Sequence, residues 1–216
     1  MSTASEIMQK NYEHQAETII KALEKRNMRG YYCADCAAAV ELAKTLTPAG
    51  STVSFGGSMT LSETGIMDML KSRTDITLLD RSQAKDAAET KQIYHDALNS
   101  DVYFMSSNAI TKDGELVNID GNGNRVAALI YGPDRVVIVT GMNKVVSTVD
   151  DGIRRVHDIA ASANGVRLGK STPCAVTGFC HDCLSPACMC SHTVITRRSY
   201  TADRIHVILV GDTLGY

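Results

Sequence analysis

Residues 135–140 (RVVIVT) are almost entirely β-branched and apolar. Such a run is typical of a strand covered on both sides in a parallel sheet, because a half-exposed strand would alternate apolar and polar residues. Residues 205–210 (IHVILV) follow a similar pattern. Other short strand patterns alternate with helical ones along the chain. We therefore predict an α/β fold with a mostly parallel sheet and flanking helices.

The expected elements follow from apolar periodicity and from the Gly and Pro residues between them. Strands are expected at 51–55, 75–79, 102–106, 116–119, 135–140 and 205–210, and helices within residues 1–30 and at 35–46, 62–70, 84–98, 126–131 and 145–161. The Asp-Gly pair within 111–115 predicts a hairpin-like turn. We expect one domain over 1–216, with an N-terminal helical part at about 3–46 and a cysteine-rich loop at 172–192.

Composition excludes several classes of protein. The 216 residues are 44% hydrophobic and 21% charged, which is incompatible with wholesale disorder. The net charge of −2 and the absence of Trp give no basis for nucleic-acid or membrane-surface binding. No apolar run approaches the roughly 18–20 residues of a membrane helix, and Met1–Lys10 lacks the apolar core of a secretory leader. A cytoplasmic location is expected.

Seven cysteines are present, and five of them lie in the short loop at 172–192. These are Cys174, Cys180, Cys183, Cys188 and Cys190. An odd count in a chain with an ample core argues against a disulfide framework and favours a metal site, with one thiol in surplus. Sulfur-only ligation favours an iron–sulfur cluster, with zinc as the alternative. The other pair, Cys33 and Cys36, is interpreted as two thiols at an ordinary helix start.

A glycine-rich loop lies between an expected strand and an expected helix at 56–63 (GGSMTLSE). In parallel sheets ligands bind beyond the carboxyl ends of the strands, and glycines there allow close approach to the backbone. The candidate binding residues are Gly56, Gly57, Ser58 and Thr60, with Glu63 as a carboxylate. The alternative is a tight turn followed by a helix cap. The loop matches neither the P-loop nor the dinucleotide fingerprint.

A second polar loop lies at 118–125 (NIDGNGNR). Its density of amide groups and glycines exceeds what a connection requires, and Arg125 offers a planar fork of donors for a carboxylate or phosphate. The candidate binding residues are Asn118, Asp120, Gly121, Gly123, Asn124 and Arg125. The alternative is a turn built from common turn residues, with a solvated Arg125.

These motifs resemble the LUD-domain family, named for lactate utilisation and earlier known as DUF162. The resemblance covers nearly the whole chain and rests on residues 57–65, 107–114, 117–125, 141–144, 172–190 and 209–216. It implies a fold of the sugar-isomerase and CoA-transferase type. Some relatives act in the oxidation of L-lactate to pyruvate beside separate iron–sulfur subunits. The chain resembles the compact form that carries its own cysteine segment.

The resemblance also implies roles for particular residues. It places a substrate crevice between the loops at 56–63 and 118–125, with Lys144 at the end of the next strand. Glu63 is then the candidate general base. Arg125 and Lys144 would anchor an anion and stabilise developing negative charge. Asp120 would orient the substrate hydroxyl or Arg125.

Three functions remain open from the sequence. The first is an enzyme of small hydroxy- or oxo-acid metabolism, with an iron–sulfur site that passes electrons to a redox partner protein. The second is a ligand-binding or regulatory module stabilised by zinc. The third is a metal-independent isomerase or acyl-transfer enzyme that depends on Glu63. In each case a small anionic ligand is expected, and the fold class is compatible with a homodimer.

Overall fold

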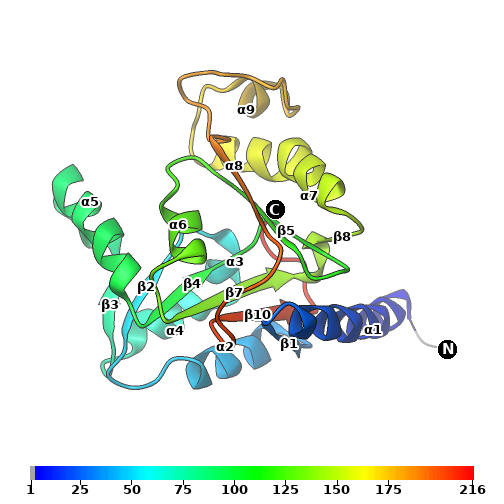
Figure 1. Cartoon of the computed structure of the whole chain (residues 1–216). Helices are drawn as coiled ribbons and strands as arrows, with labels where there is room; N and C mark the ends of the chain where they lie inside the picture. The colour runs from blue at the N-terminus through cyan, green and yellow to red at the C-terminus, as the bar shows by residue number, and fades with distance from the viewer. Residues whose placement is uncertain (1–2) are drawn as a thin grey trace.

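A six-stranded, all-parallel sheet forms the centre of the molecule in the computed structural model, which describes residues 3–216 (Figure 1). The strand order is β1-β10-β7-β4-β2-β3. The strands are β1 (Arg29–Cys33), β2 (Thr52–Phe55), β3 (Thr77–Leu79), β4 (Val102–Met105), β7 (Arg135–Gly141) and β10 (Ile205–Val210). The predicted fold class is confirmed. Met1 and Ser2, which belong to the predicted domain and N-terminal segment, lie outside the described residues.

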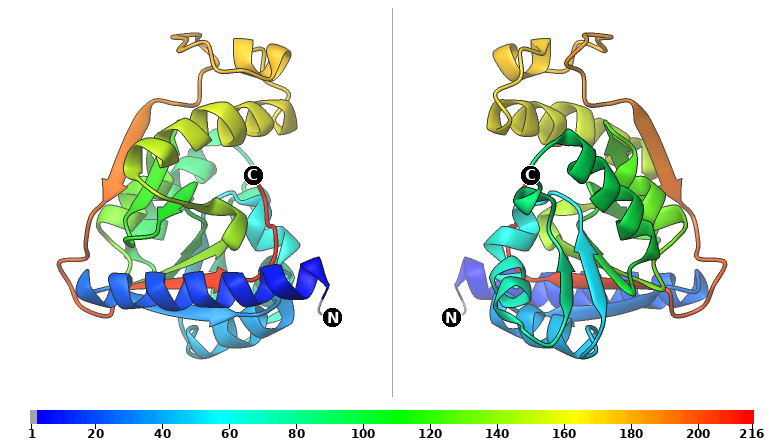
Figure 2. Two further views of the ribbon diagram at one scale, coloured as in Figure 1. Left: turned by 90° about the vertical axis from the view of Figure 1, so that its right-hand side faces the viewer. Right: turned by 90° about the vertical axis from the view of Figure 1, so that its left-hand side faces the viewer.

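The two central strands are buried on both sides, as their sequences predict. On β7, Val136 and Ile138 belong to a core that also contains residues of α1 (Ala4–Lys25) and α6 (Asn124–Ile130). The intervening Val137 and Val139 belong to the opposite core, with residues of α2 (Cys36–Thr45) and α4 (Ile66–Ser72). Successive side chains of a strand point to opposite faces, so one apolar run supplies both cores. Figure 2 shows the helices on either side of the sheet.

Of the remaining described helices, four begin where a side chain caps a backbone N–H group of the first turn, and three begin without a side-chain cap. Asp35 caps α2 and Asp86 caps α5 by accepting a hydrogen bond from the third helical N–H. They are α2 (Cys36–Thr45), α3 (Met59–Glu63), α4 (Ile66–Ser72), α5 (Ala87–Asp96), α7 (Val149–Arg155), α8 (Ala161–Arg167) and α9 (Pro173–Thr177). Short 3₁₀ turns span Arg81–Gln83, Ala97–Asn99 and Met142–Lys144, and a π-helical turn spans Val156–Ala160.

A second sheet has the strand order β8-β5-β6-β9. Its strands are β5 (Ala109–Thr111), β6 (Leu116–Asp120), β8 (Val145–Val146) and β9 (His192–Thr196). The antiparallel β5–β6 pair confirms the predicted hairpin, and Gly114 adopts φ 84° in its turn. Because β6 also pairs with β9, the sheet ties the end of the cysteine segment to the polar loop that follows β6.

Several predicted boundaries are wrong. The helix expected at 62–70 is two helices, separated by Gly65 at φ 79°. The helix expected at 145–161 begins only at Val149, because Thr148 and Asp151 form a capping box there, and Val145–Val146 is a strand. The sequence interpretation also missed β1 and β9.

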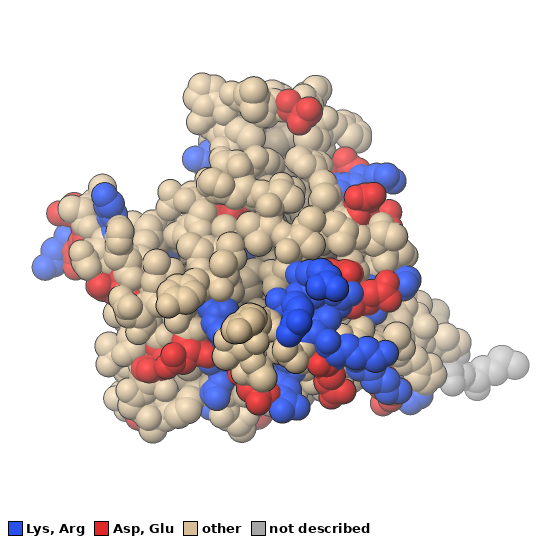
Figure 3. Space-filling view, viewed as in Figure 1, with Lys and Arg blue, Asp and Glu red and all other residues tan. Residues whose placement is uncertain are grey.

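The cysteine segment projects beyond α8 and carries almost no charge. Asp182 is the one Asp, Glu, Lys or Arg between residues 171 and 196. The projection at the top of Figure 3 is accordingly almost entirely tan. The side chains of Phe179 and Leu184 are exposed there. Within residues 3–216, no helix combines the length and apolar character needed to cross a membrane.

Candidate functional site

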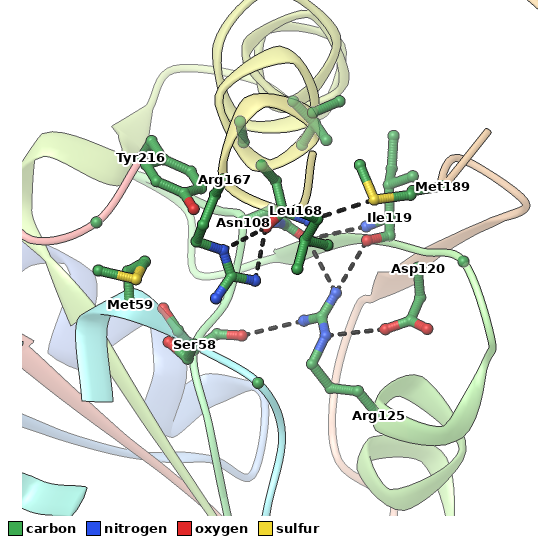
Figure 4. A pocket seen from close by; sticks show the side chains of 18 of the residues that line it. Ser58, Met59, Asn108, Ile119, Asp120, Arg125, Arg167, Leu168, Met189 and Tyr216 are labelled. Atoms are coloured by element: carbon green, nitrogen blue, oxygen red, sulfur yellow. Dashed lines mark hydrogen bonds and ion pairs between the residues drawn. The ribbon is translucent and has the colours of Figure 1, made fainter. Parts of the chain in front are cut away.

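A cavity of about 500 Å³ opens where four strands of the parallel sheet end. Its walls come from residues that directly follow β2, β4, β7 and β10, together with the end of β6 and the helices after β8 (Figure 4). The carboxyl edge of a parallel sheet is where α/β proteins bind ligands, because loops from several strands converge there. The predicted crevice between the loops at 56–63 and 118–125 is therefore a real cavity in this structure.

Most of the predicted binding residues line this cavity. They are Gly57, Ser58, Thr60, Asp120, Gly121, Asn124, Arg125 and Lys144. Gly56, Glu63, Asn118 and Gly123 were also predicted but are not among the lining residues. Of these, Gly123 begins α6 at φ 86°, and its N–H donates to Asp120 Oδ1 at 2.7 Å.

Arg125 holds three loops together. Its Nε donates to Asp120 Oδ2 at 2.9 Å, in an ion pair whose side chains are 12% and 10% exposed. Its two Nη atoms donate to the side chains of Asn118 and Asn108 and to the carbonyl oxygens of Ser106 and Ile119. These five bonds occupy all five N–H groups of a guanidinium. Arg125 thus gives the cavity charge and shape, and the predicted direct contact with a ligand would require one of these bonds to break.

Asn118 lies behind Arg125, fully buried on β6. Its Oδ1 accepts from Arg125 Nη1 at 2.5 Å, and its Nδ2 has no hydrogen-bond partner within the described residues. Asn118 therefore supports the cavity wall.

The paired glycines make room for two arginines. A Cβ at Gly56 would lie 3.1 Å from Arg125 Cδ, and one at Gly57 would lie 2.5 Å from Arg81 Nη2. The second distance is shorter than real Cβ contacts, so a larger residue at position 57 would displace the end of the Arg81 side chain. The Arg81 guanidinium lies over the ring of Tyr94, 5.6 Å from its centroid. The sequence interpretation overlooked Arg81, which follows a short strand without a motif of its own.

Lys144 is a buried lysine at the cavity wall, with a residue exposure of 4%. Its Nζ donates to Thr60 Oγ1 at 2.8 Å and to Ser106 Oγ at 3.2 Å. Burial lowers its pKa to about 7, and the positive charges of Arg155 and Arg125 act in the same direction. Glu63 acts against this change by favouring the charged amine.

Glu63 is exposed and contacts the end of the chain. Its Oε2 accepts a hydrogen bond from the Gly215 N–H at 2.5 Å. A Cβ at Gly215 would lie 3.3 Å from Lys144 Nζ, so Glu63 holds a backbone segment close to that amine. Glu63 is therefore placed to position the 214–216 segment and to bias the charge of Lys144, and it does not face the cavity as a predicted base would.

Positive charge dominates the cavity. Arg81, Arg125, Lys144, Arg167 and Lys170 line it, whereas Asp120 is the one carboxylate among the described lining residues and is paired with Arg125. Figure 4 shows Arg167 and Arg125 extending into the space from different walls. We term this space the cationic cavity. Its unbalanced charge and partly enclosed walls favour an anionic ligand.

Of the five predicted metal-ligand thiols, Cys190 lines the cationic cavity. Burial raises the pKa of Cys190 to about 12, and the nearby Cys188, Cys174 and Cys180 add to that rise. The Cys190 N–H donates to Cys188 Sγ, and the Asp182 N–H donates to Cys180 Sγ, each at 3.4 Å. All seven cysteines, including Cys183, are free thiols. Within residues 3–216, no three His, Cys, Asp or Glu side chains are already arranged around a metal position.

The π-helical turn between α7 and α8 connects the cysteine segment to the cationic cavity. Its Val156 and Ala160 line the cavity and pack with Ile119 and Cys190. Its His157 brings Nδ1 to 3.3 Å from Cys180 Sγ. The sequence interpretation treated His157 as an isolated histidine, because its proximity to Cys180 depends on how the two segments pack.

The separate pair Cys33 and Cys36 has the character of ordinary structural thiols. Burial raises the pKa of each to about 11, and Asp212 contributes at Cys36, where it accepts a hydrogen bond from Sγ. Such thiols stay protonated near neutral pH and are poor nucleophiles.

The fold and the cationic cavity define an α/β protein with a positively charged cavity at the carboxyl edge of a parallel sheet. The chain belongs to the LUD-domain family, whose model matches residues 16–210. The predicted family is confirmed.

Comparison with solved structures finds a DUF162 family protein from Deinococcus radiodurans, with 18% identity and a TM-score of 0.48 over 94% of this chain and 98% of that one. It also finds eIF2B delta from Chaetomium thermophilum, with 16% identity and a TM-score of 0.32 over 65% of this chain and 54% of that one. No curated protein matches the sequence.

Proposed function

We propose that this protein binds a small hydroxy- or oxo-acid anion in the cationic cavity and acts in the utilisation of hydroxy acids such as lactate. The observation that supports this function is the charge of the cavity: three arginines, Lys170 and the titratable Lys144 line it with one Asp, which is already paired with Arg125. A ligand carboxylate would supply the missing negative charge. The cavity volume of about 500 Å³ is ample for a small organic acid.

Arg167 and Arg81 are the donors best placed to hold the ligand carboxylate. Arg167 uses Nε and Nη2 to contact Asn164 Oδ1, which leaves Nη1 for a ligand. Arg81 has no hydrogen-bond acceptor within the described residues and stacks on Tyr94, so its guanidinium is oriented but unoccupied. Guanidinium groups bind carboxylates through two parallel hydrogen bonds, which also fixes the orientation of the ligand.

Lys144 would accept and return the hydroxyl proton of the bound acid. With its pKa near 7, the amine interconverts between charged and neutral forms close to neutral pH. A neutral amine accepts a proton from a substrate hydroxyl, and the charged form returns it. The hydroxyls of Thr60 and Ser106 hold Nζ in place for this transfer.

The cysteine segment fits an iron–sulfur cluster in its chemistry. Free thiols, together with backbone N–H groups directed at Cys180 and Cys188, are the donors and hydrogen bonds that such clusters use. Because Cys174, Cys180 and Cys188 each influence the charge of the Cys190 thiol, we propose these four as the ligands, with Cys183 as the surplus thiol. When bound, a cluster supplies one-electron transfer. The oxidation of a hydroxy acid releases electrons, and the cluster would pass them to a redox partner protein.

Titration calorimetry with L-lactate, pyruvate and inorganic phosphate tests the anion site. We expect saturable binding of at least one of these anions. Arg167→Ala should weaken it by roughly 10-fold or more, the usual effect of losing a hydrogen bond between charged groups. Arg198→Ala removes an exposed arginine that does not line the cavity and serves as the matched control. Absence of binding for all three anions, or equal losses in both variants, would contradict the proposed site.

Metal and acid-labile sulfide analysis on anaerobically purified protein tests the cofactor. Iron together with sulfide, and a broad visible absorption band, is the expected result. Zinc without iron would instead favour a ligand-binding module with a metal-stabilised loop.

A further inference from the structure

Lys144 is buried without a counter-charge. It occupies a 3₁₀ turn directly after β7, and no Asp or Glu among residues 3–216 lies within ion-pair distance of its Nζ. Its two contacts, Thr60 Oγ1 and Ser106 Oγ, are neutral hydroxyls. Buried lysines in proteins are normally paired with a carboxylate, because an isolated buried ammonium is costly. The amine of Lys144 is thus held in an environment that favours its neutral form.

A neutral amine is a nucleophile. Arg155, whose Nη1 donates to the carbonyl oxygen of Asn108 at 2.8 Å, adds a partly buried positive charge nearby that further disfavours the ammonium. Lysines activated in this way, by burial and by neighbouring cations, attack carbonyl carbons and form Schiff bases. A lysine that only neutralised an anion would not need such activation.

The surroundings of Lys144 suit a ligand that has both a carboxylate and a carbonyl group. Lys144 lines the same cavity as Ser58 and Tyr216, and Arg81 and Arg167 supply carboxylate donors in that lining. Thr60 and Ser106 have hydroxyl protons to pass between nitrogen and oxygen. The Tyr216 hydroxyl has no partner within the described residues.

We propose that Lys144 Nζ forms an imine with the carbonyl carbon of a 2-oxo acid held in the cationic cavity. Nitrogen adds to the carbonyl carbon, and an amine proton moves to the carbonyl oxygen, through the Thr60 or Ser106 hydroxyl, to give a carbinolamine. The second amine proton then moves to the carbinolamine hydroxyl by the same hydroxyls, the C–O bond breaks, water leaves, and C=N forms. No electrons are gained or lost, so the step needs no oxidant or reductant. The inference rests on the proposed function for its anion site and narrows the ligand to an oxo acid.

Reductive trapping tests the imine. The full chain is incubated with pyruvate and sodium cyanoborohydride, which reduces an imine to a stable secondary amine. We expect one adduct per chain, with a mass gain equal to pyruvic acid less one oxygen atom, and peptide mapping should place it on Lys144. Lys144→Met should abolish this adduct. Lys85→Met, which removes an exposed lysine outside the cavity lining, should retain it.

Competition by L-lactate and calorimetry with pyruvate distinguish a failure of the imine from a failure of the proposed anion site. Excess L-lactate, which has no carbonyl carbon to trap, should suppress labelling of Lys144 if both acids share the cavity. If pyruvate binds by calorimetry but no adduct forms, or if label spreads over surface lysines, the imine is wrong while the anion site stands. If Lys144 is labelled undiminished in excess lactate, the imine stands and the shared anion site is wrong. Mapping on the wild-type chain keeps the test valid even if Lys144→Met folds poorly.

Discussion

At the scale of single residues, Arg125 determines how three loops meet. Each of its N–H groups bonds to a protein acceptor, and Asp120 balances its charge. A sequence analysis recognises the arginine as a candidate anion ligand because it follows a glycine-rich loop. In the structure these donors bond to protein acceptors, including Asn118 and Asn108. The main role of Arg125 is therefore to stabilise the cavity wall.

Replacing Arg125 should therefore change the free energy of unfolding more than it changes ligand binding. Arg125→Met leaves Asp120 as an unpaired, largely buried carboxylate, and such a loss typically costs about 3–5 kcal/mol. We expect this decrease in the free energy of unfolding, measured by urea denaturation. Arg125→Lys should also be destabilised, because an ammonium has three donors and cannot fill five positions. The control Arg198→Met should change stability by less than about 0.5 kcal/mol. A stability of Arg125→Met equal to the wild type would contradict the assigned role.

Glu63 should act on the charge of Lys144 from a distance. Its carboxylate favours the ammonium form, so Glu63→Gln should lower the pKa of Lys144 further below its ordinary value. The glutamine keeps an acceptor oxygen for the Gly215 N–H, which limits structural change. NMR titration of the Lys144 Cε resonance measures this, and a midpoint at lower pH than in the wild type is expected. An unchanged or higher midpoint would contradict the coupling.

At the scale of elements, the doubly covered strands were predicted, whereas the edge strands β1 and β9 were missed. The largely apolar runs of β7 and β10 identify strands covered on both sides. β1 pairs on one side only, and its sequence RGYYC has no alternation of apolar and polar residues. β9 carries the β-branched run at 193–196, a signal that was available but lay just beyond the cysteine segment.

The candidate site was predictable only in part for a related reason. Loops at the carboxyl ends of predicted strands could be identified, and the same rule applied to residues 106–108 would have found Asn108. Arg81 and Arg167 could not be found, because a turn and a helix end bring them to the cavity from elements without a motif. The contact between His157 and Cys180 likewise exists only through tertiary packing.

The π-helical turn gives an element-scale prediction. Its His157 contacts Cys180 Sγ, and hydrogen bonds to cluster sulfurs stabilise the reduced state by offsetting negative charge. We expect His157→Ala to lower the midpoint potential of the iron-loaded protein, measured by spectroscopic redox titration. His14→Ala, at an exposed position of α1, is the control and should leave the potential unchanged. A midpoint potential that is unchanged or higher in His157→Ala would contradict a hydrogen bond from this histidine to a cluster sulfur.

At the scale of the whole molecule, the central strand β10 carries a buried histidine that links folding to pH. His206 Nδ1 lies 3.0 Å from Tyr31 Oη and Nε2 lies 2.8 Å from the carbonyl oxygen of Asp203, and the ring stacks on Tyr31. Burial is the largest cause that lowers its pKa below the ordinary value of 6.5, and the positive charge of Arg135 adds to it. Asp203 acts in the opposite direction.

The sign of the pH effect follows from this lowered pKa. Below about pH 6.5 the unfolded chain binds a proton at His206 that the folded chain resists, so acidification favours unfolding until the folded pKa is reached. Above this pH range, the contribution of His206 to the free energy of unfolding does not change with pH. We expect the wild type to lose stability between about pH 6.5 and 5 by more than His206→Gln does, at most about 1.4 kcal/mol per pH unit. Parallel stability curves for the two proteins in this range would contradict the linkage.

The central claim is that the cationic cavity binds a small carboxylate acid beside Lys144. A crystal structure of the full chain with pyruvate tests it most directly. The account predicts density for the acid within the cavity, with its carboxylate on Arg167 and Arg81 and its carbonyl carbon next to or bonded to Lys144 Nζ. An empty cavity at a pyruvate concentration that saturates binding in solution, or pyruvate bound elsewhere on the chain, would contradict it.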